Sequence, residues 1–150
     1  MERAVLQLIT AFAGSLGFGM LFHLRRKLLM PAAVGGMLCW GVYLLAIQWL
    51  EGILVPSLLA SAFAALYAEL LARRLRAPAT IFLIPTVVPM IPGSTLYYAM
   101  SHAVRGEWAE ARSFGAQTVQ YALGIAIGIS LVWALMEMAR NLAAGFGNRR

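Results

Sequence analysis

The 150 residues are 61% hydrophobic and only 12% charged, with a formal net charge of +6. Because soluble domains are about 25% charged and about half apolar, this chain has too little polar surface to cover a water-soluble globule. We therefore expect an all-α integral membrane protein that forms a single transmembrane domain over residues 1–150, surrounded by the lipid bilayer. The positive charge gathers at the ends of apolar stretches, which indicates topology signals and no nucleic-acid partner.

Residues with metal-binding or catalytic chemistry are few and scattered. Cys39 is the single cysteine, and His23 and His102 are the two histidines. They show no spacing typical of metal ligands, so we expect no metal and no other cofactor. The chain has no G-x-S-x-G, no H-E-x-x-H and no pair of intramembrane aspartates, which argues against an enzyme.

Five apolar stretches are close to the ~20 residues that a membrane-spanning helix needs. They cover residues 4–22, 28–50, 53–72, 79–100 and 114–138. The first could be a cleaved signal peptide, but its basic cluster follows the apolar run instead of preceding it, which favours an uncleaved span. Thr10, Gly14 and Gly17 share one face of this span, and we expect that face to pack against a neighbouring helix.

Basic residues are divided unequally between the two sets of loops. Nine would lie on one side of the membrane and three on the other: Arg25, Arg26, Lys27, Arg73, Arg74, Arg76, Arg140, Arg149 and Arg150, against Arg3, Arg105 and Arg112. Since basic loops stay on the cytoplasmic side, this distribution predicts an N-terminus outside and a cytoplasmic C-terminus. The polar segment 101–112 is then expected to be the one substantial outer loop.

The third span carries a stripe of small residues that leads to an acid. Ser57, Ser61 and Ala65 recur every four residues and are followed by Glu69, which precedes Arg73 by four residues. That spacing favours an ion pair at the membrane boundary. A carboxylate near the membrane is also a candidate for proton coupling, so Glu69 is our coupling candidate.

The fourth span contains the residues least compatible with a helix. Within nine residues it holds Pro85, Pro89, Pro92 and Gly93. Each proline lacks the N–H that would bond the carbonyl four residues earlier, so we expect free carbonyls at Ile81, Pro85 and Val88. Free carbonyls are tolerated within a membrane only where they face protein or water. We therefore predict a discontinuous helix, broken at or just beyond the middle of the span.

The residues after the break can begin a second half-helix. Ser94 and Thr95 are good N-cap residues. The free N–H groups of residues 93–96 would suit a carboxylate, because a helix N-terminus carries partial positive charge. Tyr97 could add a hydroxyl donor, and freed carbonyls before the break could hold an ammonium group or a cation.

The fifth span has polar and small residues on one face. Gln117, Tyr121, Gly124 and Gly128 lie on it, and Gln120 borders it. The face is either a helix contact, which we favour, or the polar wall of a solute path. Together with the break, the candidate substrate-binding residues are Pro89, Pro92, Gly93, Ser94, Thr95, Tyr97, Gln117, Gln120 and Tyr121.

Pro85, Pro89, Pro92, Gly93 and Tyr97 form the pattern P-x-x-x-P-x-x-P-G-x-x-x-Y. With five short spans, this pattern resembles the threonine/serine exporter family, more narrowly the small membrane subunit of its split, two-chain type. The resemblance implies proton-driven export of threonine and serine, small carboxylate-bearing solutes, across the bacterial inner membrane. In some split members it implies export of dicarboxylates such as succinate. It also implies a larger partner chain with a hydrophilic domain.

No internal repeat is recognisable in the chain, whereas many secondary transporters contain two related repeats. This favours either a homo-oligomer or a second, complementary chain. A different function remains open: if the prolines only shape a helix–helix contact, the chain is a non-transporting scaffold or assembly subunit.

Overall fold

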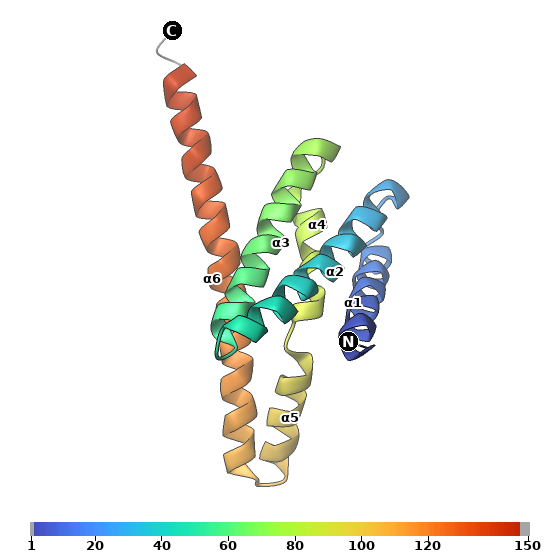
Figure 1. The fold of residues 1–150 in the computed structure, drawn as a ribbon, viewed down its shortest axis with the longest axis vertical. Coiled ribbons are helices and arrows are strands. Elements are labelled where there is room, and N and C mark those ends of the chain that lie inside the picture. The colour runs from blue at the N-terminus through green and yellow to red at the C-terminus, as the bar shows by residue number, and fades with distance from the viewer. Residues whose placement is uncertain (1, 148–150) are drawn as a thin grey trace.

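A computed structural model describes residues 2–147, and these residues form helices and no strand. Figure 1 shows them in chain order: α1 (Glu2–Leu21), α2 (Arg26–Trp49), α3 (Leu54–Leu75), α4 (Ala79–Val87), the short 3-10 helix η1 (Val88–Met90), α5 (Gly93–Val104) and α6 (Trp108–Gly147). α4 lies among α1, α2 and α3, whereas α6 packs against α3 at the side of this group.

Four helices are long and apolar enough to cross a membrane: α1, α2, α3 and the Trp108–Leu142 part of α6. α4 with η1 passes the same test together with α5, as a pair bent by 49°. The predicted all-α membrane fold with a discontinuous fourth span is therefore confirmed. The predicted sidedness stays a prediction, and Arg149 and Arg150, which contribute to it, lie outside the described residues.

The polar segment 101–112 is helical, which contradicts the predicted outer loop. α5 continues to Val104 and α6 begins at Trp108, so only a short turn at Gly106 joins them. The side chains of His102 and Glu107 meet across this turn. The prediction weighed polarity alone, although alanine, glutamate and arginine in this segment are good helix formers.

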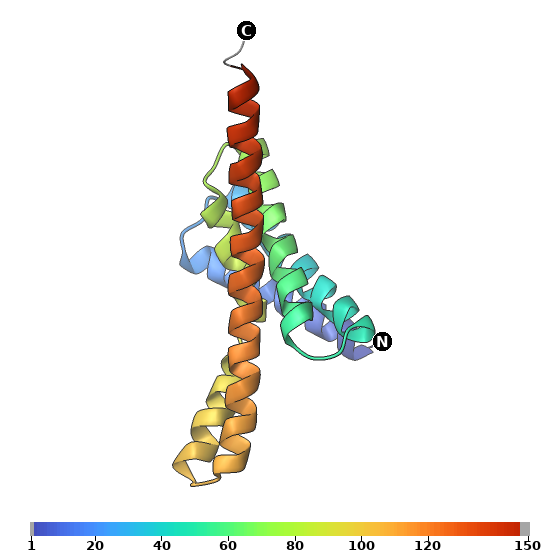
Figure 2. The same cartoon turned by 90° about the vertical axis from the view of Figure 1, so that its left-hand side faces the viewer.

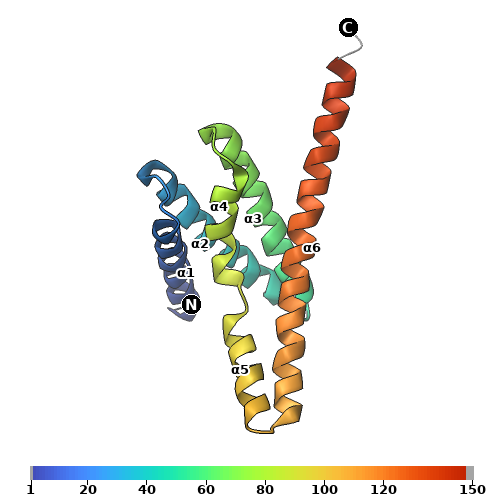
Figure 3. The same cartoon turned by 180° about the vertical axis from the view of Figure 1, so that it is seen from behind.

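α5 and the first turns of α6 form a helical hairpin that projects beyond the α2–α3 connection (Figures 1 and 3). Figure 2 shows α6 running the full height of the molecule, with α5 beside its lower part. The 40 residues of α6 make a helix of about 60 Å. That is twice the ~30 Å thickness of the hydrocarbon layer, so α6 extends beyond the predicted span.

Small residues bring α3 and α6 into close contact. A β-carbon added at Gly124 would lie 2.7 Å from Leu54 O and 2.8 Å from Ser57 Cβ. One turn later, a β-carbon at Gly128 would overlap the Ser61 hydroxyl, which lies 3.2 Å from Gly124 O. The packing interpretation is thus confirmed for both glycines, because only glycine permits this approach of the two backbones.

α1 packs through a different face from the one predicted. Gly14 and Gly17 face open space, where an added β-carbon would meet nothing within 4 Å. The buried residues of α1 are instead Ala11, Ser15 and Gly19. These three are also four residues apart, so α1 has two small-residue faces and the sequence pattern did not distinguish them.

Candidate functional site

The break in the fourth span lies between Met90 and Gly93. α4 continues through Pro85 to Val87, one 3-10 turn follows, and Ile91 is extended, with φ −62° and ψ 122°. In Figures 1 and 3 the break lies at the height of the α2–α3 connection, not midway along the neighbouring helices. Ala79–Met90 precedes the break and Gly93–Val104 follows it, so the break lies near the middle of the bent pair, as predicted; its depth in the membrane stays a prediction.

Of the three carbonyls predicted to be free, those of Ile81 and Pro85 lack the helical N–H donor, whereas that of Val88 has another donor. Val88 O accepts the Ile91 N–H at 3.1 Å, so it is not free. Pro85 O loses the Pro89 donor, and the nearby Val88 N–H donates to Ile84 O. Ile81 O likewise has no N–H at Pro85. The carbonyls that lack the donor four residues later therefore belong to α4 and lie before the break.

The start of α5 differs from the predicted N-terminal anion site. Its N-cap residue is Pro92, not Ser94 or Thr95, and no side chain caps the helix. The Gly93 N–H donates to Ile91 O at 2.7 Å and the Leu96 N–H to Pro92 O at 3.1 Å. Only the N–H groups of Ser94 and Thr95 remain of the predicted four. A proline at the N-cap explains the change, because its fixed φ starts the helix two residues earlier than a cap at Ser94 would.

The candidate residues near the break are divided between the surface and a contact with α6. Gly93, Ser94 and Tyr97 are exposed. Thr95 is half-buried; its hydroxyl donates to Pro92 O at 3.1 Å and lies 2.9 Å from the hydroxyl of Thr118 on α6. The sequence reading missed Thr118, although it lies next to Gln117.

Of the candidate residues of α6, Tyr121 contacts α2 and not α5. The Tyr121 hydroxyl lies 2.6 Å from the Tyr43 hydroxyl of α2. Gln117 and Gln120 are half-buried. Tyr43 was not singled out from the sequence, because it lies far from Tyr121 along the chain and only the packing of α2 brings them together.

Glu69 forms the predicted ion pair with Arg73, at 3.3 Å. Its carboxylate side chain is only 16% exposed. It also lines a cavity of about 410 Å³ between α3 and α6, together with Glu137 and Arg140, which form an ion pair of their own. Glu69 is therefore placed in a charged cavity, where its proton-coupling role stays a prediction.

A small cavity, which we call the polar cavity, lies between α1, α2 and η1. Its volume is about 200 Å³, and it is lined by Gln7, Thr10, Ala11, Trp40 and Pro89. Pro89 is the one residue of the predicted break that lines it. The Trp40 Nε1–H is enclosed by protein and has no hydrogen-bond partner.

One helical turn from the polar cavity, three helices meet at their closest point. Ser15 of α1 is fully buried, and its hydroxyl has no partner. A β-carbon at Gly36 of α2 would overlap that hydroxyl and would lie 3.4 Å from Pro85 O of α4. We call these three residues the Ser15 junction. The sequence reading missed it because a serine, a glycine and a carbonyl on three helices share no linear motif.

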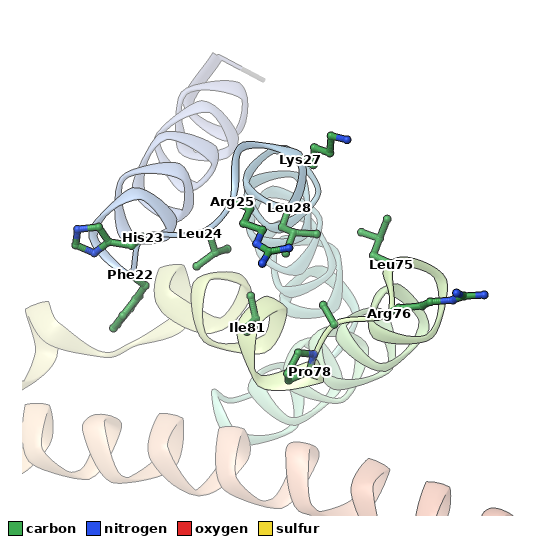
Figure 4. A pocket seen from close by; sticks show the side chains of 11 residues that line it. Phe22, His23, Leu24, Arg25, Lys27, Leu28, Leu75, Arg76, Pro78 and Ile81 are labelled. Carbon is green, nitrogen blue, oxygen red and sulfur yellow. The ribbon is translucent and has the colours of Figure 1, made fainter.

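A larger cavity lies at the end where the α1–α2 and α3–α4 connections meet. This basic cavity measures about 570 Å³. Figure 4 shows Arg25 reaching into it between Leu28 and Ile81, while Lys27 and Arg76 point outward. His23 and Arg76 have φ of 55° and 51°, which is uncommon for residues other than glycine.

A fourth cavity of about 170 Å³ adjoins the basic cavity. It shares Phe22, Leu24 and Ile81 with the basic cavity and extends along α4 to Pro85. We call it the connecting cavity. The basic, connecting and polar cavities thus follow one face of α4 and η1, and the Ser15 junction separates the last two.

Comparison with known proteins identifies a family. The family model described as threonine/serine exporter, ThrE, matches residues 7–135. No curated protein and no solved structure matches the chain.

Proposed function

Because the chain belongs to the threonine/serine exporter family, we propose that it is a subunit of a secondary exporter that moves threonine, serine and related small carboxylate-bearing solutes out of the bacterial cell. The observation that carries this proposal is the family match over residues 7–135, which includes all of the helices from α2 to α5. The helices are those of a multi-pass membrane protein, and the inner membrane is the proposed location.

The distribution of polar groups supports solute export. An amino acid brings a carboxylate and an ammonium group into the membrane, and each needs hydrogen-bonding partners there. The described helices supply donors such as the Trp40 Nε1–H, which has no protein partner, and acceptors such as Pro85 O, which loses its helical donor at Pro89. Arg25 at the basic cavity adds a positive charge, which attracts carboxylates.

Proton coupling is the proposed energy source, with Glu69 as the residue that exchanges the proton. Its side chain is mostly buried and lies in a cavity at one end of α3. Its partner Arg73 is 55% exposed, so the ion pair is open to water on one side. A carboxylate in this position can change partner when it takes up a proton.

A larger, complementary chain is the proposed partner. α5 has no buried residue in this chain, and Tyr97, Met100 and Val104 are 66%, 63% and 89% exposed. An apolar helix that projects from the bundle with one neighbour only is suited to burial against another membrane chain.

The test is efflux of labelled solute from preloaded bacterial cells. Cells would express this chain, a complementary chain of the same exporter family, or both, at matched membrane abundance. We expect threonine and serine efflux to rise at least several-fold with both chains and to fall when an uncoupler removes the proton gradient. Succinate efflux instead would assign the dicarboxylate function, and unchanged efflux of all three solutes would contradict export.

A further inference from the structure

Within the exporter function proposed above, we propose that the solute passes between α1 and α4 and is held at the Ser15 junction, where Ser15, Gly36 and Pro85 meet. This path differs from the one predicted from the sequence, which placed the solute at the start of α5 and on α6. It follows from the order of the cavities, the unpartnered polar groups and the weak contact between α1 and α4.

The cavities are aligned along one face of the fourth span. The basic and connecting cavities share Phe22, Leu24 and Ile81, and the connecting cavity ends at Pro85. The polar cavity is lined by Pro89, which lies one helical turn after Pro85. Only the Ser15 junction interrupts the series. A closed point between two cavities is expected of a solute path that is shut in the present conformation and opens when the solute binds.

The Ser15 hydroxyl is free to bind a ligand. The hydroxyls of Ser57, Ser61 and Thr118 donate to a carbonyl three or four residues earlier. Ser15 makes no such bond although it is fully buried. Thr86 of α4 shares with Ser15 a buried hydroxyl that has no partner. A buried hydroxyl without a partner is unfavourable and requires an explanation, and a bound solute supplies one.

The groups around the junction match a small amino acid. The Ser15 O–H and the Trp40 Nε1–H can donate to a carboxylate, and Pro85 O can accept from an ammonium group. The polar and connecting cavities measure about 200 and 170 Å³. These volumes are below the ~300–1,000 Å³ of pockets for drug-sized ligands, so they suit a solute of the size of serine or threonine.

The packing of α1 allows this path to open. α1 packs chiefly against α2 and makes far fewer contacts with α4 and η1. A shift of α1 relative to α4 would therefore separate Ser15 from Pro85 O without disrupting the main contacts of either helix. Arg25 lies in the connection between α1 and α2, so the same movement would change the basic cavity.

Thiol labelling tests the path in the full chain with its partner. In a Cys39→Ala background, Ser15→Cys is compared with Gly14→Cys, its neighbour on the exposed face of α1. We expect a membrane-impermeant thiosulfonate reagent to modify position 15 in cells, at least fivefold more slowly with saturating threonine, and to leave position 14 unmodified. No modification at position 15, or modification that threonine does not slow, would overturn the path.

Efflux of threonine provides a second readout. Ser15→Ala removes one hydroxyl, and we expect it to reduce efflux at least tenfold at equal membrane abundance. Gly36→Ala places a methyl group where the Ser15 hydroxyl lies and should abolish efflux, whereas Gly14→Ala should retain at least half. If the unmodified chains export threonine and Ser15→Ala does so equally well, the path is wrong and the exporter function stands. If the unmodified chains export nothing, the exporter function itself fails.

Discussion

At the scale of single residues, the glycines divide into those that permit a helix contact and those that face open space. Gly36 and Gly128 have no room for a β-carbon, whereas Gly14 and Gly115 meet no atom within 4 Å. All four lie in helices, and the sequence alone does not distinguish one from another. They differ in whether a neighbouring helix lies against them, so the same substitution should have different effects at different glycines.

Gly128→Val should destabilise the contact between α3 and α6, because the new side chain would collide with Ser61 and Leu58 O. Overpacking of this kind costs about 1–3 kcal/mol. Gly115→Val is the matched control, since it makes the same change in the same helix without a neighbour. The free energy of unfolding in detergent, from a denaturant titration, measures both. Equal losses for the two variants would contradict the α3–α6 packing.

Tyr43 and Tyr121 form a second residue-scale test. Their hydroxyls are 2.6 Å apart, so Tyr43→Phe and Tyr121→Phe should each cost about 0.5–1.5 kcal/mol. The double variant should lose clearly less than the sum of the two single losses, because one hydrogen bond can be lost only once. The same denaturant titration measures this, and strictly additive losses would show that the two hydroxyls do not interact.

At the scale of helices, apolar length and prolines were enough to predict the spans and the break. Periodicity was enough to predict the pairing of Gly124 and Gly128 with a neighbour. The helical hairpin of α5 and α6 and the packed face of α1 were predicted wrongly. Each depends on where a helix sits relative to its neighbours, and no local pattern contains that information. The Ser15 junction was missed for the same reason.

The α5–α6 hairpin can be tested by a disulfide. The Thr95 and Thr118 hydroxyl oxygens lie 2.9 Å apart, so the two side chains point toward each other and cysteines at these positions are expected to cross-link. In a Cys39→Ala background, Thr95→Cys with Thr118→Cys should cross-link on mild oxidation, detected as a mobility shift that a reductant reverses. Tyr97→Cys with Thr118→Cys is the control, because Tyr97 points into solvent or lipid with 66% of its surface exposed. An equal yield from both pairs would argue against the hairpin.

At the scale of the whole molecule, the helices determine how many times the chain crosses the membrane, and the charges in the loops determine its orientation. With α4 to α5 counted as one span, the chain crosses five times, so its two ends lie on opposite sides. The excess of basic residues after α1, α3 and the apolar part of α6 predicts a cytoplasmic C-terminus. A fluorescent reporter fused there should be bright and an alkaline phosphatase reporter inactive. The reverse pattern would invert the sidedness and place the basic cavity outside.

The central claim is that this chain, with its complementary partner, exports threonine and serine by means of the proton gradient. The most direct measurement is labelled threonine flux in proteoliposomes that contain the purified pair of chains. An imposed pH gradient should drive threonine against its own concentration gradient, in the direction opposite to proton flow, and an uncoupler should abolish this. Flux that is no greater than in protein-free liposomes, with the pH gradient present, would contradict the account.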